Sequence, residues 1–231
     1  MRAAIVTGAS SGIGLCISRL LLEKQYKVYG IGRDFSKTDL EKNQFIKIAC
    51  DLTNTGKLES FIKEIRKKDE IHILVNNAGL AYFGPHEELN PKKIHEMVAV
   101  NLEAPLVLSQ LLLRDLKKNQ GYIFNISSVT AKKSSPHGCA YGATKAGLTS
   151  FSESLFDEVR KYGVKVITIH PDMTKTNLYR NANFHEGPSE DTYLLPEEVA
   201  QVIDMVLNQR EGVVISDISL KPQKHQIQRK I

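Results

Sequence analysis

The fold is decided by "TGASSGIG", residues 7–14, which joins a short apolar run at 3–7 to an amphipathic segment at 12–24. Its glycines, Gly8, Gly12 and Gly14, form the pattern G-x-x-x-G-x-G. Glycine allows a tight turn and a close approach of the backbone to a pyrophosphate, whose charge a helix N-terminus stabilises. An apolar strand, a glycine turn and a helix in this order predict a dinucleotide-binding unit. A tight turn that holds no ligand is the alternative.

Other residues near this turn are candidates for the same site. Ser10 and Ser11 offer hydroxyl donors to a phosphate, and Ile13 lies within the same turn. In "CDLT", after the third expected strand, Asp51 is placed to accept a hydrogen bond from an adenine amino group, with Leu52 beside it. An aspartate at such a point is equally explained as a helix cap or a turn residue.

The end of the second expected strand discriminates between the two nicotinamide dinucleotides. An acidic side chain there would bind the ribose hydroxyls of NAD(H), whereas a basic one would favour the 2′-phosphate of NADP(H). In "GIGRD", Gly32 stands at the position of the acid and Arg33 follows it. Because a guanidinium binds phosphate well, we expect NADP(H) in preference to NAD(H). Asp34 leaves NAD(H) open, and a solvated surface role for Arg33 is the alternative.

Apolar and amphipathic stretches alternate along the chain. Runs typical of buried strands recur at 3–7, 27–32, 45–50, 71–79, 121–127, 164–171 and 212–216. Helical patterns lie between them at 12–24, from 55, at 91–118 with a break near 101–105, at 141–162 and from 196. Apolar strands separated by amphipathic helices indicate a parallel sheet covered on both faces. We predict an α/β fold in a single domain, residues 1–231: a doubly wound (Rossmann), mostly parallel sheet of about seven strands, with ligands at the carboxyl ends of the strands. No pattern is evident in the tail after residue 219.

The composition is that of an ordinary soluble globular protein, with 42% hydrophobic and 25% charged residues. A net charge of +5 is spread along the 231 residues rather than gathered in blocks, so nucleic acid is not an expected partner. The three cysteines have no spacing typical of a disulfide framework or a metal site, which favours a reducing compartment. No signal peptide and no run of about 18 apolar residues is recognised. We expect a cytoplasmic protein without a metal site or a membrane segment.

A second informative stretch is "YGATK", residues 141–145, which lies among small residues. Tyr141 and Lys145 are four residues apart and so share one face of a helix. A phenol with a pKa near 10 is a poor base at neutral pH. A cation about 4 Å away, at an effective dielectric constant near 20, is worth roughly 4 kcal/mol, or about three pKa units. The pair therefore predicts a tyrosine made more acidic by its lysine; an exposed helix pair is the alternative.

Five motifs in register resemble the short-chain dehydrogenase/reductase family. They are "TGASSGIG" at 7–14, "NNAG" at 76–79, "VNL" at 100–102, "NISS" at 125–128 and "YGATK" at 141–145. The resemblance extends from residue 3 to about residue 214. It implies an oxidoreductase that moves a hydride between a nicotinamide cofactor and a small carbonyl or secondary alcohol substrate.

The resemblance also implies roles for individual residues. Tyr141 is expected to be the acid/base, and Ser128 to hold the carbonyl oxygen of the substrate. Asn101 is expected to anchor a water linked to Lys145, which would also bind the nicotinamide ribose. Further cofactor contacts are implied for a set of residues at strand ends: Asn77, Ala78, Gly79, Tyr141, Lys145, Pro171 and Thr176.

One position departs from the family pattern. After the sixth expected strand the family commonly has Pro-Gly, whereas this chain has Asp172 after Pro171. An aspartate sometimes adopts the backbone dihedral angles of glycine, so the turn can survive, but the cofactor geometry near Thr176 is in doubt.

Substrate specificity is expected in a mobile loop at about 176–195, where Tyr179, Arg180, Phe184 and His185 are candidates to face the substrate. The apolar stretch at 102–113 resembles a helix that the family uses for dimer contacts, so we expect a homodimer or homotetramer. The alternative function is a non-catalytic nucleotide-binding sensor or scaffold with the same fold. Against it, all four residues implied in catalysis are present.

Overall fold

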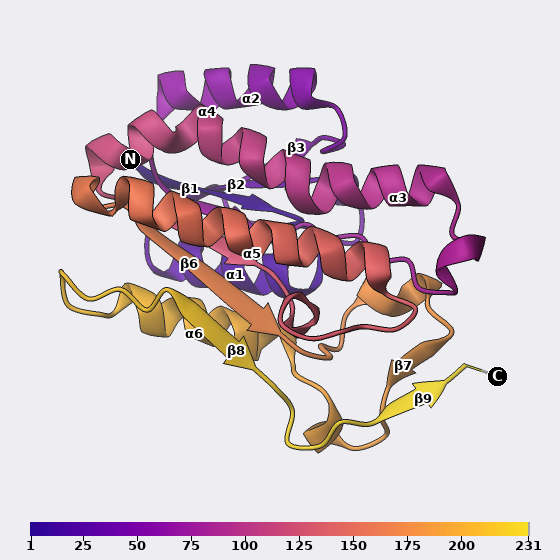
Figure 1. The fold of residues 1–231 in the computed structure, drawn as a ribbon. Helices are drawn as coiled ribbons and strands as arrows, with labels where there is room; N and C mark the ends of the chain where they lie inside the picture. Colours follow the sequence, from indigo (N-terminus) through magenta and orange to yellow (C-terminus); the bar gives the residue numbers. More distant parts are fainter. Residues whose placement is uncertain (231) are drawn as a thin grey trace.

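The computed structural model describes residues 1–230. Its centre is a seven-stranded sheet in the order β3-β2-β1-β4-β5-β6-β8, in which every neighbouring pair is parallel (Figure 1). The predicted doubly wound, mostly parallel fold is confirmed. The sheet strands are β1 (Arg2–Thr7), β2 (Lys27–Gly32), β3 (Phe45–Ala49), β4 (Glu70–Asn76), β5 (Tyr122–Ile126), β6 (Lys165–Pro171) and β8 (Asp217–Leu220).

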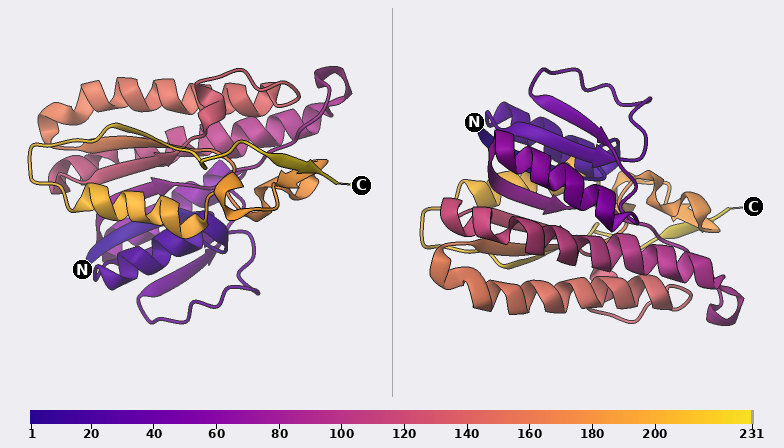
Figure 2. Two further views of the ribbon diagram at one scale, coloured as in Figure 1. Left: turned by 90° about the horizontal axis from the view of Figure 1, so that it is seen from below. Right: turned by 90° about the horizontal axis from the view of Figure 1, so that it is seen from above.

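Helices cover both faces of this sheet (Figure 2). They are α1 (Gly12–Glu23), α2 (Thr55–Lys68), α3 (Pro91–Val98), α4 (Ala104–Asn119), α5 (Cys139–Val159) and α6 (Pro196–Leu207). Alternate side chains of β1 enter the two cores: Ala3 and Ile5 pack with α2, α4 and α5, whereas Ala4 and Val6 pack with α1 and α6. This alternation explains why both faces of a central strand must be apolar.

The last strand of the sheet lies later in the chain than predicted. The sequence indicated residues 212–216, but β8 spans Asp217–Leu220 and pairs with β6 from Thr168 onward. The apolar run that suggested the earlier position forms the connection into the strand. An edge strand has a partner on one side only, so its register is set by that partner rather than by continuous hydrophobicity.

The C-terminal tail contains a strand that the sequence did not indicate. β9 (Ile227–Arg229) pairs antiparallel with β7 (Phe184–Glu186), which lies inside the loop at 176–195. The Lys230 ammonium adds a hydrogen bond of 3.0 Å to the carbonyl oxygen of Tyr179. All three residues of β9 are exposed, so the strand has no apolar periodicity to reveal it. The tail therefore holds the loop in which we expect substrate specificity.

The segment Pro91–Asn119 is helical throughout, with a π-helical turn over Ala99–Glu103 that joins α3 to α4. It is long and apolar enough to cross a membrane by length and composition alone. It is not an unbroken apolar run, since Asn101 and Glu103 lie within it. Half of the most apolar 18-residue stretch of this helix is buried inside the protein. Leu108, Leu112 and Leu116 lie in the core between α4 and the sheet. Their burial accounts for the apolar character of the helix.

We predict that a chain ending at Lys221 keeps the seven-stranded sheet but loosens the loop. The strand that is removed is exposed, so the global free energy of unfolding should change by less than about 1 kcal/mol. Amide hydrogen exchange at residues 184–186 should accelerate roughly tenfold or more, since these amides lose their partner strand. Amides of β1 serve as the internal control, and unchanged exchange at 184–186 would contradict the prediction.

Candidate active site

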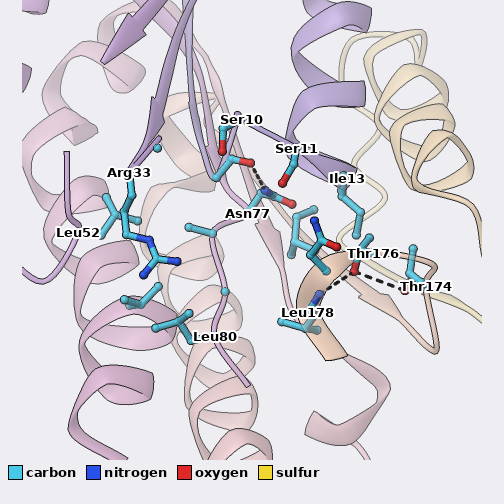
Figure 3. A pocket seen from close by; sticks show the side chains of 18 of the residues that line it. Ser10, Ser11, Ile13, Arg33, Leu52, Asn77, Leu80, Thr174, Thr176 and Leu178 are labelled. Atoms are coloured by element: carbon cyan, nitrogen blue, oxygen red, sulfur yellow. Dashed lines mark hydrogen bonds between the residues drawn. The ribbon is translucent and has the colours of Figure 1, made fainter. Parts of the chain in front are cut away.

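A cavity of about 360 Å³ opens at the carboxyl ends of the central strands. It lies where the strand order reverses between β1 and β4, which is the usual ligand position in doubly wound folds. Figure 3 shows Ser10, Ser11 and Ile13 on one side of it, Arg33 and Leu52 on the other, and the loop residues Thr174, Thr176 and Leu178 along its lower edge.

The glycine turn forms the floor of this cavity. Gly8 and Gly12 have left-handed backbones, with φ of +66° and +53°. A Cβ atom on Gly14 would lie 2.3 Å from the carbonyl oxygen of Gly8 and 2.5 Å from the side-chain nitrogen of Asn77. Only glycine allows α1 to begin so close to the end of β1, and this close packing leaves room for a pyrophosphate beside the start of the helix.

The predicted cofactor residues fall around the same cavity with one exception. Those that line it are Gly8, Ser10, Ser11, Gly12, Ile13, Arg33, Asp51, Leu52, Asn77, Ala78, Gly79, Tyr141, Lys145, Pro171 and Thr176. Gly14 is buried behind the turn and does not line the cavity. Its role is the close packing of helix on strand rather than contact with a ligand.

Asp51 and Arg33 occupy the end of the cavity formed by β2 and β3. One carboxylate oxygen of Asp51 accepts hydrogen bonds from the amide (3.0 Å) and the hydroxyl (2.9 Å) of Thr53. The hydrogen bond from the Thr53 amide is the main reason that the pKa of Asp51 is lowered, and the charge of Arg33 adds to it. Asp51 is thus a turn residue that also keeps a carboxylate at the cavity wall. Arg33 is exposed and lines the cavity with its positive charge.

The opposite end of the cavity is lined by Ser128, Tyr141 and Lys145. Ser128 follows β5 and caps the next helical turn, where its hydroxyl accepts a hydrogen bond from the amide of Thr130 at 3.2 Å. Tyr141 and Lys145 come from the first turns of α5 and are 5% and 3% exposed. The Lys145 ammonium lies 5.8 Å from the centre of the Tyr141 ring and donates to the carbonyl oxygen of Ile126 at 2.8 Å.

The acidity of this tyrosine differs from the sequence expectation. Burial raises the pKa of Tyr141 to about 12, and the nearby Ser128 hydroxyl offsets only part of the rise. Burial also lowers the pKa of Lys145 to about 8. The sequence argument counted the attraction between the phenolate and the ammonium but not the removal of both groups from water, and here desolvation is the larger effect.

Asn101 lies behind the cavity rather than in its wall. Its side-chain amide donates to the carbonyl oxygen of Leu80 and accepts from the Leu80 amide, both at 2.8 Å. A Cβ atom on Gly79 would lie 3.8 Å from both the Asn101 amide oxygen and the Lys145 nitrogen. Asn101, which lies in the π-helical turn, therefore fixes the loop after β4 close to Lys145.

The aspartate that replaces the family glycine causes no backbone strain. Asp172 is not among the positive-φ residues of the described chain, so the turn does not require glycine. One carboxylate oxygen of Asp172 accepts from the Met173 amide at 2.9 Å, and Thr176 caps the next turn by accepting from the Leu178 amide at 3.3 Å. The turn thus survives, and Asp172 adds a carboxylate to the cavity wall.

Two features of the site were not predicted from the sequence. The ring centre of Phe83 lies 5.8 Å from that of Tyr141, and the rings of Tyr179 and Phe184 from the loop pack against Phe83 and against each other. His170 contacts the main chain of Ser128 at 3.1 Å from inside β6. Tyr179 and Phe184 were predicted as substrate-facing candidates, whereas Phe83 and His170 carry no sequence signal beyond their proximity to motifs.

A family model described as short chain dehydrogenase matches residues 2–187. The chain belongs to this family. An uncharacterized oxidoreductase of Staphylococcus aureus strain USA300 is 29% identical over 228 residues, covering 96% of this chain and 97% of the relative. A counterpart in strain MW2 is 30% identical over 226 residues, covering 95% of this chain and 96% of the relative.

Solved structures of the family superpose over nearly the whole chain. An alcohol dehydrogenase from the archaeon Thermococcus sibiricus, complexed with 5-hydroxy-NADP, has a TM-score of 0.87 at 25% identity and covers 98% of this chain and 99% of its own. A serine dehydrogenase complexed with NADP⁺ has a TM-score of 0.85 at 27% identity, covering 96% and 95%. A 4-hydroxyisoleucine dehydrogenase complexed with NADH and succinate has a TM-score of 0.82 at 25% identity, covering 95% and 97%.

We predict that Lys145→Met stabilises the fold at neutral pH. The lysine pKa is about 8 in the folded chain against its usual 10.5, so the unfolded chain binds this proton more tightly and the burial penalty is complete below pH 8. Removing the buried ammonium should add about 2 kcal/mol to the free energy of unfolding, allowing for the lost hydrogen bond to Ile126.

The gain should shrink as the pH rises from about 8 to 10.5, because the folded lysine is then already neutral, as its pKa of about 8 requires. Denaturant unfolding at pH 7 and pH 10 measures the effect, with Lys161→Met at an exposed position as the matched control. A loss of stability at pH 7, or a gain independent of pH, would contradict the prediction.

Proposed function

We propose that this short-chain dehydrogenase is an NAD(P)(H)-dependent oxidoreductase that transfers a hydride between a nicotinamide cofactor and a carbonyl or secondary alcohol carbon. One observation carries the proposal: a glycine turn suited to a pyrophosphate and the set Ser128, Tyr141 and Lys145 line the same cavity. Structural neighbours complexed with NADP or NADH support it. The alternative, a non-catalytic nucleotide sensor, has no corresponding support in these relatives.

The residues along the cavity are suited to hold each part of a dinucleotide. The main chain at Gly12 and Ile13 and the hydroxyls of Ser10 and Ser11 would hold the pyrophosphate, and Lys145 the nicotinamide ribose. Arg33 is exposed at the end where the adenosine ribose would lie. A guanidinium there favours a 2′-phosphate, so we propose NADP(H) as the preferred cofactor.

Tyr141 is suited to donate a proton to a substrate carbonyl oxygen. The bound nicotinamide would supply or accept the hydride. With a pKa raised to about 12, the phenol is fully protonated at neutral pH and ready to act as an acid during reduction. Ser128, whose hydroxyl lies at the same end of the cavity, would hold the carbonyl oxygen by a hydrogen bond. Alcohol oxidation needs the phenolate, so it should be favoured by alkaline pH.

The substrate side of Tyr141 indicates an uncharged, apolar carbonyl compound. Phe83 packs against the phenol, and Tyr179 and Phe184 extend it into an aromatic cluster whose neighbouring ring centres are 5.1–6.0 Å apart. Asp172 and Arg180 both line the same cavity, and Asp172 lies 3.8 Å from the Lys133 ammonium, so the proposed selection rests on the aromatic rings rather than on charge. The loop at 176–195 would open to admit the substrate and close over it.

We extend the proposal to the organisation of the protein. Residues 1–231 would form one domain that acts as a homodimer or homotetramer in the cytoplasm, with the helix at 102–113 at the subunit contact. Sedimentation of the purified chain measures the assembly state.

We predict that Tyr141→Phe abolishes reduction of a carbonyl compound by NADPH, with a loss of roughly 100-fold or more in kcat. Cofactor affinity and thermal stability should stay close to those of the parent, since the ring remains. A panel that pairs acetophenone with pyruvate tests turnover, and acetophenone should be the better substrate. Full activity in the variant would refute the role of the tyrosine, and no turnover of any carbonyl by the parent would favour the sensor.

We predict that Arg33→Ser raises the KM for NADPH about tenfold and leaves the KM for NADH nearly unchanged. The reason is that the guanidinium would contact the 2′-phosphate, which NADPH carries and NADH lacks. Steady-state kinetics with both cofactors measures the ratio, and Arg160→Ser, at an exposed arginine on the far end of α5, is the matched control. An equal effect on both cofactors would show that Arg33 does not discriminate between them.

A further inference from the structure

His170 is a buried imidazole that the proposed chemistry does not use. It lies in β6 directly before Pro171 and is fully buried. Its Nδ1 atom is 3.1 Å from the main-chain carbonyl oxygen of Ser128. Its Nε2 atom is 2.8 Å from a carboxylate oxygen of Asp217, the first residue of β8. Both ring nitrogens therefore face oxygen atoms that only accept hydrogen bonds.

This geometry determines the proton count of the ring. A neutral imidazole has one N–H group and one lone pair, so it can donate to one of the two oxygens but would turn a lone pair towards the other. An imidazolium donates to both. A buried charge of this kind needs a counter-charge, and the Asp217 carboxylate supplies it at hydrogen-bond distance.

The charges around the ring are consistent with this arrangement. The second oxygen of Asp217 pairs with the Lys132 ammonium, which comes from the turn after β5. Burial tends to raise the pKa of Asp217, but hydrogen bonds from Lys132 and His170 outweigh it, and the pKa is lowered. Further along the same edge, Asp172 lies 3.8 Å from the Lys133 ammonium. Asp217 therefore stays ionised and available to the ring.

We propose that His170 is held as an imidazolium and acts as a positioning residue for Ser128. It ties the main chain of the serine, at the end of β5, to the edge strand β8, and so sets where the Ser128 hydroxyl points. The hydroxyl is carried on the Cβ atom of the same residue and accepts a hydrogen bond from the amide of Thr130 at 3.2 Å. The effect on turnover rests on the proposed function of Ser128, whereas the protonation state of His170 does not.

The sharpest variant is Asp217→Asn, since this side chain is 41% exposed and its replacement is nearly isosteric. It removes the counter-charge, so His170 should become neutral; the new side-chain amide can donate to Nε2, so the hydrogen bond from Nδ1 to Ser128 remains. A second variant, His170→Phe, removes both hydrogen bonds of the ring, and the carbonyl oxygen of Ser128 then keeps only the hydrogen bond from the Ala131 amide at 3.0 Å. Lys132→Met is the matched control, because it removes the other partner of the same carboxylate without touching the ring. The Lys132 side chain is likewise 41% exposed.

The first measurement is nitrogen-15 NMR of the histidine rings in the full chain at pH 7. His170, identified through its assigned backbone, should show two protonated ring nitrogens in the parent and in Lys132→Met, and a neutral ring in Asp217→Asn. In His170→Phe, the amide signals of Ser128 and Thr130 should also shift, because the hydrogen bond from the ring to the Ser128 carbonyl is lost. A neutral ring in the parent, or unmoved amides in His170→Phe, would overturn the proposal.

The second measurement separates positioning from simple stability. His170→Phe should lower kcat for carbonyl reduction roughly tenfold, while the affinity for NADPH and the KM for the carbonyl compound stay within about twofold. Lys132→Met should leave all three nearly unchanged. An equal loss in Lys132→Met and His170→Phe, or an unchanged kcat in His170→Phe, would overturn the positioning role. If the parent turns over no carbonyl compound, the proposed function fails, and the NMR arm still decides whether His170 is charged and holds Ser128.

Discussion

The close crossing of α1 over the end of β1 is the constraint on which the rest of the structure depends. The carbonyl oxygen of Gly8 occupies the space where any side chain at position 14 would begin. Asn77, which follows β4, adds a further contact here: its side-chain nitrogen lies 2.9 Å from the carbonyl oxygen of Thr7. Because these backbones touch, the start of the helix is directed at the open cavity beside the paired carboxyl ends of β1 and β4. The cofactor site is the space that this contact leaves.

Desolvation rather than attraction governs the reactive end of that space. Tyr141 and Lys145 are both almost fully buried, and burial moves each pKa towards the neutral form, to about 12 and about 8. The protein therefore keeps a protonated phenol and a weakened cation ready in a low-dielectric pocket, at the expense of stability. A positive charge that arrives with an oxidised nicotinamide would act strongly in such surroundings, because little water screens it.

The edge of the sheet connects these groups to the loop over the substrate. β8 contacts the buried His170 through Asp217 and then leads into the tail, where β9 pairs with β7. Lys224 in the same tail forms an ion pair of 2.7 Å with Asp191 of the loop. One short stretch at the end of the chain thus supports both Ser128 and the aromatic wall beside Tyr141. Neither connection is local in the sequence.

The sequence by itself determined the layered α/β fold, the glycine turn and about half of the residues that line the cavity, because these follow from local patterns: apolar period, glycine spacing and motifs in register. Tertiary structure decided the rest. The direction of the Tyr141 pKa shift depends on how deeply the ring is buried, which no pairwise spacing encodes. The position of β8 and the existence of β9 depend on partner strands 40 or more residues away. His170 and Phe83 became parts of the site only because β6 and the loop after β4 bring them against Ser128 and Tyr141.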